Sequence, residues 1–308
     1  MPRFPICFAL FLFFCLCSMT HAASDLSLSY GKRTDDLRWT IAGDVCGYSP
    51  NILSELIWRD IESNEFGVTL SGDLRRDLMF RGSFKYGKVT SGDNQDSDYL
   101  YDNRGGEFSR SYSDASDGHV MDLSFAIGTE RKTVLPNHTR VGHIMMGFAR
   151  NTQAMRMRDG VQVIGESISG CIEMWPPGTR YPDLDSRYEA MWTGFFLGGD
   201  IAYVKPRIEF RAGAELHAGW YDAEAYWNLR DLYFEHEANS AYGLVLTGGV
   251  FFPLRADWRL GLTAEYTRWE SGSGKDRIWQ SGVYAGQAIF NGAEWTSHKF
   301  LLSLEKHL

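Results

Sequence analysis

The feature that most constrains this chain is an alternation of polar and apolar residues over very long segments. It is clearest in residues 207–220, where one set of alternate positions is charged, glycine or histidine, and the other set is apolar. Successive side chains of a strand point to opposite faces, so this spacing predicts a strand well beyond the usual length of about five or six residues. The same period of two recurs from residue 24 onward, which predicts an all-β fold.

The connections between these segments indicate what kind of β structure they build. Tight turns alternate with long polar connections at 91–117, 153–187, 222–238 and 271–290. Short turns on one side and long loops on the other are typical of outer-membrane barrels. We therefore predict an antiparallel transmembrane β-barrel of about ten strands with long extracellular loops. The expected strands are 26–44, 52–73, 77–90, 118–131, 139–152, 188–203, 207–221, 239–252, 257–270 and 291–308.

Side-chain type along these strands predicts which face is turned to lipid. Ile208, Phe210, Leu216, Leu260 and Leu262 are expected to face lipid, whereas polar residues at the intervening positions should fill the lumen, as in a narrow barrel. Lumen candidates are Arg207, Glu209, Arg211, Glu215, Thr263, Glu265, His143 and His217, and aromatic girdle candidates are Trp58, Trp192, Tyr203, Trp220, Phe251, Phe252, Trp258 and Trp269. A soluble exported barrel or sandwich remains the alternative, because alternation does not say which face is outside.

The first residues predict export. Arg3, an apolar run over residues 6–17 and a small-residue site near Ala22 are typical of a signal peptide, expected over residues 1–22, with the barrel domain over 23–308. The destination is then the cell outer membrane, whose lipid is the expected partner. Cys46 and Cys171 should both lie on the outer side, so a disulfide between them is predicted, with two free thiols as the alternative. The formal net charge of -8 argues against a nucleic-acid partner.

At this point the chain resembles the omptins, which are outer-membrane endopeptidases on a ten-stranded barrel. The resemblance rests on Asp77-Leu78-Met79, on Asp96-Ser97-Asp98-Tyr99, on Gly219-Trp220 and on the shared order of strands and loops. It implies peptide-bond hydrolysis by a water that an Asp pair on one wall and an Asp-x-His on the other wall activate. The Asp pair corresponds to Asp96 and Asp98, whose side chains leave the same face of an extended segment.

The second half of that motif is altered in this sequence. Depending on one gap, its positions fall on Asp222 and Glu224 or on Ala223 and Ala225, and neither pair contains a histidine. The nearest imidazole is His236, which could take the water's proton only if its loop folds back. A surface salt bridge between His236 and its neighbouring glutamates is the simpler interpretation. Similarly, Asp96 and Asp98 could belong to a solvated acidic loop or, with Asp93, to a calcium site.

Two functions of different classes follow. The first is a surface endopeptidase that acts on peptides or proteins, with Asp96, Asp98 and His236 as catalytic residues and no cofactor or metal. The second is a non-catalytic barrel that serves as an adhesin, a ligand-binding surface or a structural protein. A diffusion porin ranks third, because ten strands leave little open lumen. The functions differ in whether a carboxylate or imidazole from residues 222–237 lies across the barrel mouth from Asp96 and Asp98.

Overall fold

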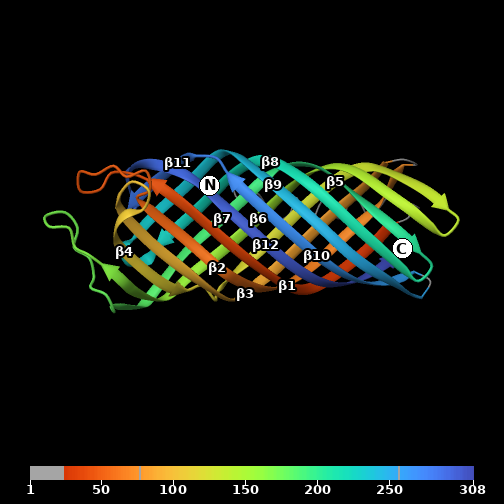
Figure 1. The fold of residues 1–308 in the computed structure, drawn as a ribbon, viewed down its shortest axis with the longest axis horizontal. Coiled ribbons are helices and arrows are strands. Elements are labelled where there is room, and N and C mark those ends of the chain that lie inside the picture. Colours follow the sequence, from red (N-terminus) through yellow and green to blue (C-terminus); the bar gives the residue numbers. More distant parts are fainter. Residues whose placement is uncertain (1–23, 76–77, 256) are drawn as a thin grey trace.

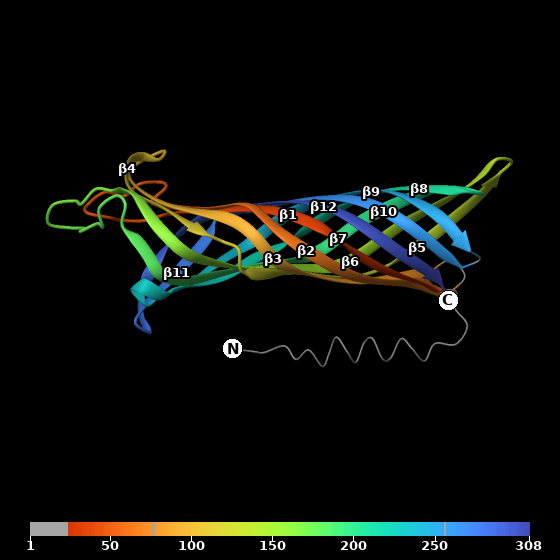
Figure 2. The ribbon, with the colours of Figure 1, turned by 90° about the horizontal axis from the view of Figure 1, so that it is seen from below.

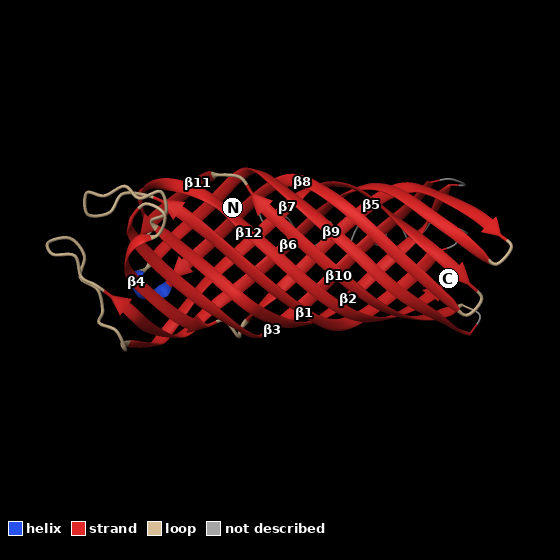
Figure 3. Ribbon diagram, viewed as in Figure 1, coloured by secondary structure: helices blue, strands red, loops and turns tan. Residues whose placement is uncertain are grey.

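The computed structural model describes residues 24–75, 78–255 and 257–308, so the predicted signal peptide and Asp77 lie outside the described residues. The all-β prediction is confirmed, since one antiparallel sheet closes on itself where the first strand pairs with the last (Figures 1 and 3). The strands are β1 Ser24–Ala42, β2 Ser54–Arg75, β3 Leu78–Tyr101, β4 Gly105–Asp114, β5 Gly118–Leu135, β6 His138–Gly165, β7 Arg180–Lys205, β8 Ile208–Trp227, β9 Leu232–Arg255, β10 Trp258–Ser271, β11 Gly274–Gln280 and β12 Val283–His307, and a single turn of 3-10 helix, η1, covers Asn228–Arg230.

The twelve strands occupy ten positions around the barrel. β4 and β5 share one position, because both lie between β3 and β6, and β10 and β11 share another, between β9 and β12. Short breaks at residues 115–117 and 272–273 separate the members of each pair. The expected arrangement of about ten strands around the barrel is therefore confirmed, although two of the ten positions are each divided between two strands. Among the described residues, no helix is long and apolar enough to cross a membrane.

Most residues of the four predicted long loops belong to strands instead, so that prediction was largely wrong. Most of 91–117 and 222–238 is strand, and β6, β7, β11 and β12 take up much of the other two segments. The barrel wall therefore continues as a sheet through most of these residues, at one end of the barrel (Figure 2). The alternation is hard to read there, because the interior at this end mixes polar with apolar side chains, so the sequence shows no clean period of two.

The outer surface carries the apolar belt that a lipid-facing barrel needs. Phe210, Leu216 and Leu262 are exposed, and Arg211, Glu215 and Glu265 point into the lumen, as predicted. The girdle prediction was partly wrong. Trp220, Phe252 and Trp258 are exposed as expected, whereas Trp58, Trp192, Trp269 and Phe251 are buried inside. Their positions in the alternation are inward, and strand-end location alone had suggested a girdle.

The interior has a region of paired charges inside the apolar belt, which we call the ion-paired lumen. Lys299 Nζ lies 2.5 Å from Asp122 and 2.8 Å from Glu265, and Arg33 lies 3.0 Å from both Glu65 and Asp122. Other pairs in this region are Arg81–Asp200, His143–Asp200, His217–Glu215, Arg211–Glu209 and Arg211–Glu305. The predicted lumen ion pairing is thus present, except that Arg207 lies exposed in the turn between β7 and β8.

A second region, which we call the aromatic layer, closes the barrel above the ion-paired lumen. Its members are Trp39, Trp58, Tyr188, Trp192, Tyr221, Trp269, Phe290 and Trp295, all nearly fully buried. Trp192 contacts Tyr221, Trp269 and Trp295, with ring centroids 4.5, 5.9 and 6.2 Å apart. These buried rings pack against one another across the barrel interior.

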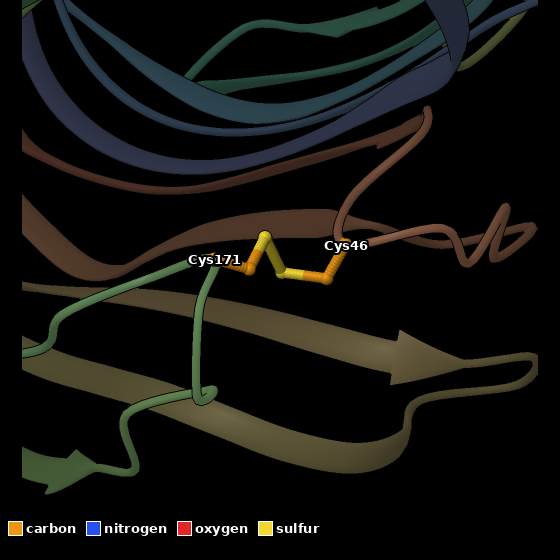
Figure 4. Close-up of a disulfide and its surroundings, with 2 residues drawn as sticks. All are labelled: Cys46 and Cys171. Atoms are coloured by element: carbon orange, nitrogen blue, oxygen red, sulfur yellow. A yellow bond between two sulfur atoms is a disulfide. The ribbon is translucent and has the colours of Figure 1, made fainter.

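The two ends of the barrel differ. Tight turns and the C-terminus lie at one end, where Asp25 pairs with His307, and the longer loops lie at the other (Figures 1 and 2). At the loop end, Cys46 in the β1–β2 connection and Cys171 in the β6–β7 connection form a disulfide with Cα atoms 5.6 Å apart (Figure 4). This confirms the predicted bond. It ties together two connections that are 125 residues apart in sequence.

Candidate functional site

The loop end of the barrel holds a cavity of about 570 Å³ above the aromatic layer. We call it the mouth cavity. On β7 the order of inward residues is Asp200 in the ion-paired lumen, Trp192 in the aromatic layer and Leu184 at the cavity. The cavity's ionisable residues are Asp96, Asp98, Glu173, Tyr181, Arg230 and Asp276, and most of the remaining wall is apolar. Asp96 lies ten residues beyond the exposed Tyr86 on β3, so the cavity lies outside the apolar belt.

Asp96 and Asp98 occupy one wall of the mouth cavity. Both belong to β3, which is paired on its two sides with β2 and β4, so they are strand residues and the acidic-loop interpretation was wrong. Asn94, Asp96 and Asp98 share one face of the strand and all three line the cavity. Asp93 lies on the other face and is exposed, which contradicts the calcium alternative. No three His, Cys, Asp or Glu side chains suited to a metal ion cluster within the described residues.

Burial changes the acidity of both carboxyls. It is the largest influence on Asp96 and, with the nearby charge of Asp98, raises the pKa of Asp96 to about 7 against an attraction from Arg230. Burial also raises the pKa of Asp98, although Arg230 and hydrogen bonds from Ser54 and Ser109 oppose it. The hydroxyl donors favour a carboxylate at Asp98. Asp96 is therefore the member of the pair better suited to hold a proton near neutral pH.

The second half of the omptin pattern is absent from β8. The inward positions are Ala223 and Ala225, both buried, whereas Asp222 and Glu224 lie on the outward face of the strand. The imidazole comes from the neighbouring strand instead. His236 on β9 lies directly opposite Ala223 in the strand register. Around the ten positions of the ring, β9 lies five positions from β3, so His236 belongs to the wall across from Asp96 and Asp98.

His236 is neither a loop residue nor a surface salt-bridge partner, so both expectations were wrong. It is 1% exposed, and its ring stacks on Phe290 at 4.5 Å and meets the edge of Trp39 at 4.7 Å. Its Nδ1 lies 3.0 Å from the Tyr188 hydroxyl, which in turn lies 2.6 Å from the Tyr221 hydroxyl. Burial lowers the pKa of His236 to about 3, so the imidazole is neutral at physiological pH.

Asp276 is a cavity-lining residue that lies next to His236. It lies on β11, opposite His236 in the register, and its Oδ1 is 3.5 Å from His236 Nε2. Neither of these two atoms has a hydrogen-bond partner among the described residues. Asp276 lines the cavity, and burial raises its pKa to about 7. Below about pH 7 the pair is therefore a protonated carboxyl that faces a neutral imidazole.

Sequence reasoning missed Asp276 and Arg230. Asp276 falls in a segment interpreted as loop, and its only signal is that it shares a strand face with the cavity residue Ile278. Arg230 ends the 3-10 turn between β8 and β9, and no sequence pattern marks it. The structure thus brings Asp96, Asp98 and Asp276 to one cavity, with His236 directly behind Asp276.

The closed ring of antiparallel strands, its apolar outer belt and its filled interior define an outer-membrane β-barrel protein. A model of the Protochlamydia outer membrane protein family matches residues 27–308, and the chain belongs to that family. This supports the predicted outer-membrane location. No curated protein matches the chain.

Among solved structures, the outer membrane protease OmpT from Escherichia coli has a TM-score of 0.69 and 13% identity, covering 94% of this chain and 99% of that one. The toluene transporter TbuX from Ralstonia pickettii has a TM-score of 0.33 and 10% identity, covering 94% and 90%. Neisserial surface protein A has a TM-score of 0.31 and 7% identity, covering 92% and 97%. At these identities the first match supports the omptin-type fold alone, and the other two are too distant in shape to support more.

Proposed function

We propose that the protein is an outer-membrane endopeptidase that hydrolyses peptide bonds in the mouth cavity. The observation that carries the proposal is the pairing of Asp96 and Asp98 on one inward strand face, with a pKa of about 7 for Asp96. Two adjacent carboxyls that share one proton can hold a water molecule between an acceptor and a donor. The fold shared with OmpT, which is a protease, is consistent with this chemistry.

The two carboxyls have different hydrogen-bond partners, and this difference gives them different roles in the reaction. Asp98, which accepts hydrogen bonds from Ser54 and Ser109, takes a proton from the water as its oxygen attacks the carbonyl carbon. Asp96 keeps its proton and donates a hydrogen bond to the carbonyl oxygen, on which negative charge develops. The substrates of this reaction are peptides or proteins that reach the loop end of the barrel.

A peptide library tests the proposal directly. The purified barrel in lipid should cleave a mixed library, and Asp96→Asn, Asp98→Asn and the double variant should each lose nearly all activity, because both carboxyls hold the same water. Asp93→Asn is the matched control, since Asp93 lies on the same strand but on the outer face. Equal digestion by wild type and double variant, or no digestion by either, would refute the enzyme.

The second candidate is a non-catalytic barrel that binds a ligand in the mouth cavity. The observation that favours it is the replacement of the Asp-x-His positions by Ala223 and Ala225, together with an imidazole that is sealed from solvent. In that case the same library should bind to the barrel without being cut, and the double variant should bind it equally well.

A further inference from the structure

Among the ionisable groups of the mouth cavity that the reaction above leaves unused, Asp276 is the buried one. Asp276 is 2% exposed and faces the cavity, and its Oδ1 has no hydrogen-bond partner among the described residues. A buried polar oxygen without a hydrogen-bond partner costs free energy, so its retention needs an explanation. His236 Nε2 lies 3.5 Å from this oxygen.

The support behind Asp276 is rigid. His236 is held from behind by the Tyr188 hydroxyl and on its faces by Phe290 and Trp39. Tyr188 is fixed in turn by Tyr221. A neutral imidazole offers a lone pair or an N–H at Nε2 but no positive charge, so it does not drive Asp276 to ionise. These neighbours therefore favour the protonated form of Asp276, whereas an arginine or lysine in the place of His236 would favour its carboxylate.

We propose that Asp276 is a third catalytic carboxyl, which donates its proton to the leaving amine, and that His236 is a positioning residue that keeps Asp276 protonated and aimed at the cavity. The inference rests on the proposed peptidase function and adds a residue to it. The groups that face Asp276 are His236 from β9 and, across the cavity, Asp96, Asp98 and Arg230, and the sealed Tyr188 lies behind His236.

The proton balance of the step is closed. When the carbon–nitrogen bond breaks, its electron pair moves to nitrogen, and nitrogen takes the proton of Asp276. The proton that Asp98 removed from water then returns through cavity water to the Asp276 carboxylate. One water is consumed, one acyl group gains an oxygen, one amine is released, and all three carboxyls recover their starting states.

The leaving group of the substrate distinguishes this role from a structural one. An amine must be protonated to leave, whereas 4-nitrophenolate leaves without a proton, so only the amide needs a general acid. The probes are a peptide that the wild-type barrel cleaves and the 4-nitrophenyl ester of its acyl half. Asp276→Asn should lower kcat on the amide by about 10²–10⁴-fold, the range for general acid catalysis, and lower kcat on the ester less than about tenfold.

Variants of the neighbours complete the test. His236→Leu should resemble Asp276→Asn on both probes, and His236→Gln should recover part of the amide rate because an amide can still hydrogen-bond to the carboxyl. Lys275→Ala, one residue from Asp276 on the exposed face, is the control and should cleave both probes normally. Equal losses on amide and ester in Asp276→Asn, or none on either, would overturn the role of Asp276 and leave the Asp96–Asp98 reaction standing. A wild type that cleaves no peptide would overturn both.

Discussion

The ion-paired lumen and the mouth cavity both bury carboxyl groups, but they treat them in opposite ways. In the lumen, Asp122 lies 2.5 Å from Lys299 and 3.0 Å from Arg33. In the cavity, Asp96 and Asp98 make no salt bridge within the described residues, although the charge of Arg230 acts on both, and the near neighbour of Asp276 is the His236 imidazole. Carboxyls that form ion pairs with buried cations stay charged and fill space, whereas carboxyls that are shielded from water and form no ion pair are able to hold protons. The difference separates a structural interior from a chemical one within the same barrel.

The largest effect is expected from removing a cation in the lumen. Lys299→Met removes the cation that contacts Asp122, Glu265 and Glu65 together and leaves them with only Arg33 and Lys85 as cationic partners. Loss of one member of a buried ion pair costs about 3–5 kcal/mol, so the free energy of unfolding in lipid should fall by that amount in a urea titration. Lys132→Met, at an exposed position near the β5–β6 turn, should change it little. A small effect at Lys299 would mean that the lumen charges are not paired as described.

The second-largest effect is expected from removing the disulfide that ties two connections together beside the mouth cavity. Val45 and residues 172–175 line the mouth cavity beside the disulfide of Cys46 and Cys171. Replacing both cysteines by serine should lower the local opening free energy of these connections by about 2–4 kcal/mol, the usual contribution of a disulfide. Limited proteolysis should then cut residues 43–53 and 166–179 faster while the strands stay protected. Unchanged cutting would show that packing alone holds the connections.

The smallest effect is expected from Asp96→Asn, and it is a stabilisation of the folded barrel. The pKa of Asp96 is raised to about 7 in the folded protein, so the folded state binds an extra proton between about pH 4 and pH 7. The stabilisation that Asp96 contributes is therefore fully present below the pKa of an unfolded aspartate and is lost as the pH rises through about 7. Asp96→Asn should stabilise the barrel by about 1–3 kcal/mol near pH 8 and little near pH 4. Asp93→Asn is the control. Destabilisation at both pH values would place Asp96 among paired structural charges.

The same difference between the two regions explains which parts of the fold could be predicted from the sequence. Inside the apolar belt, polar and apolar residues alternate strictly, and this regularity predicted the barrel, the direction of Leu262 and Arg211, and the interior ion pairs. At the cavity end, buried alanine, tryptophan and aspartate share the inward positions, so β4, β11 and the ends of β8 and β9 were interpreted as loops. Periodicity fails where both faces of a strand vary.

The candidate site was predicted only in part for the same reason. Asp96 and Asp98 were found because two aspartates at a spacing of two share a face. Asp276 reaches His236 through strand register across a sheet, and one sequence without pairing information does not determine that register. The histidine was named from proximity along the chain, and its burial under Phe290 and Trp39 could not be anticipated from its two glutamate neighbours.

The central claim is that Asp96 and Asp276 each keep a proton near neutral pH in the mouth cavity. Infrared spectroscopy of the barrel in lipid measures this directly, because a protonated carboxyl has a carbonyl stretching band that a carboxylate lacks. We predict a protonated band at about pH 6 that disappears above about pH 8 and that weakens separately in Asp96→Asn and in Asp276→Asn. A wild-type spectrum with no protonated band at about pH 6, or with a band of unchanged intensity in both variants, would contradict it.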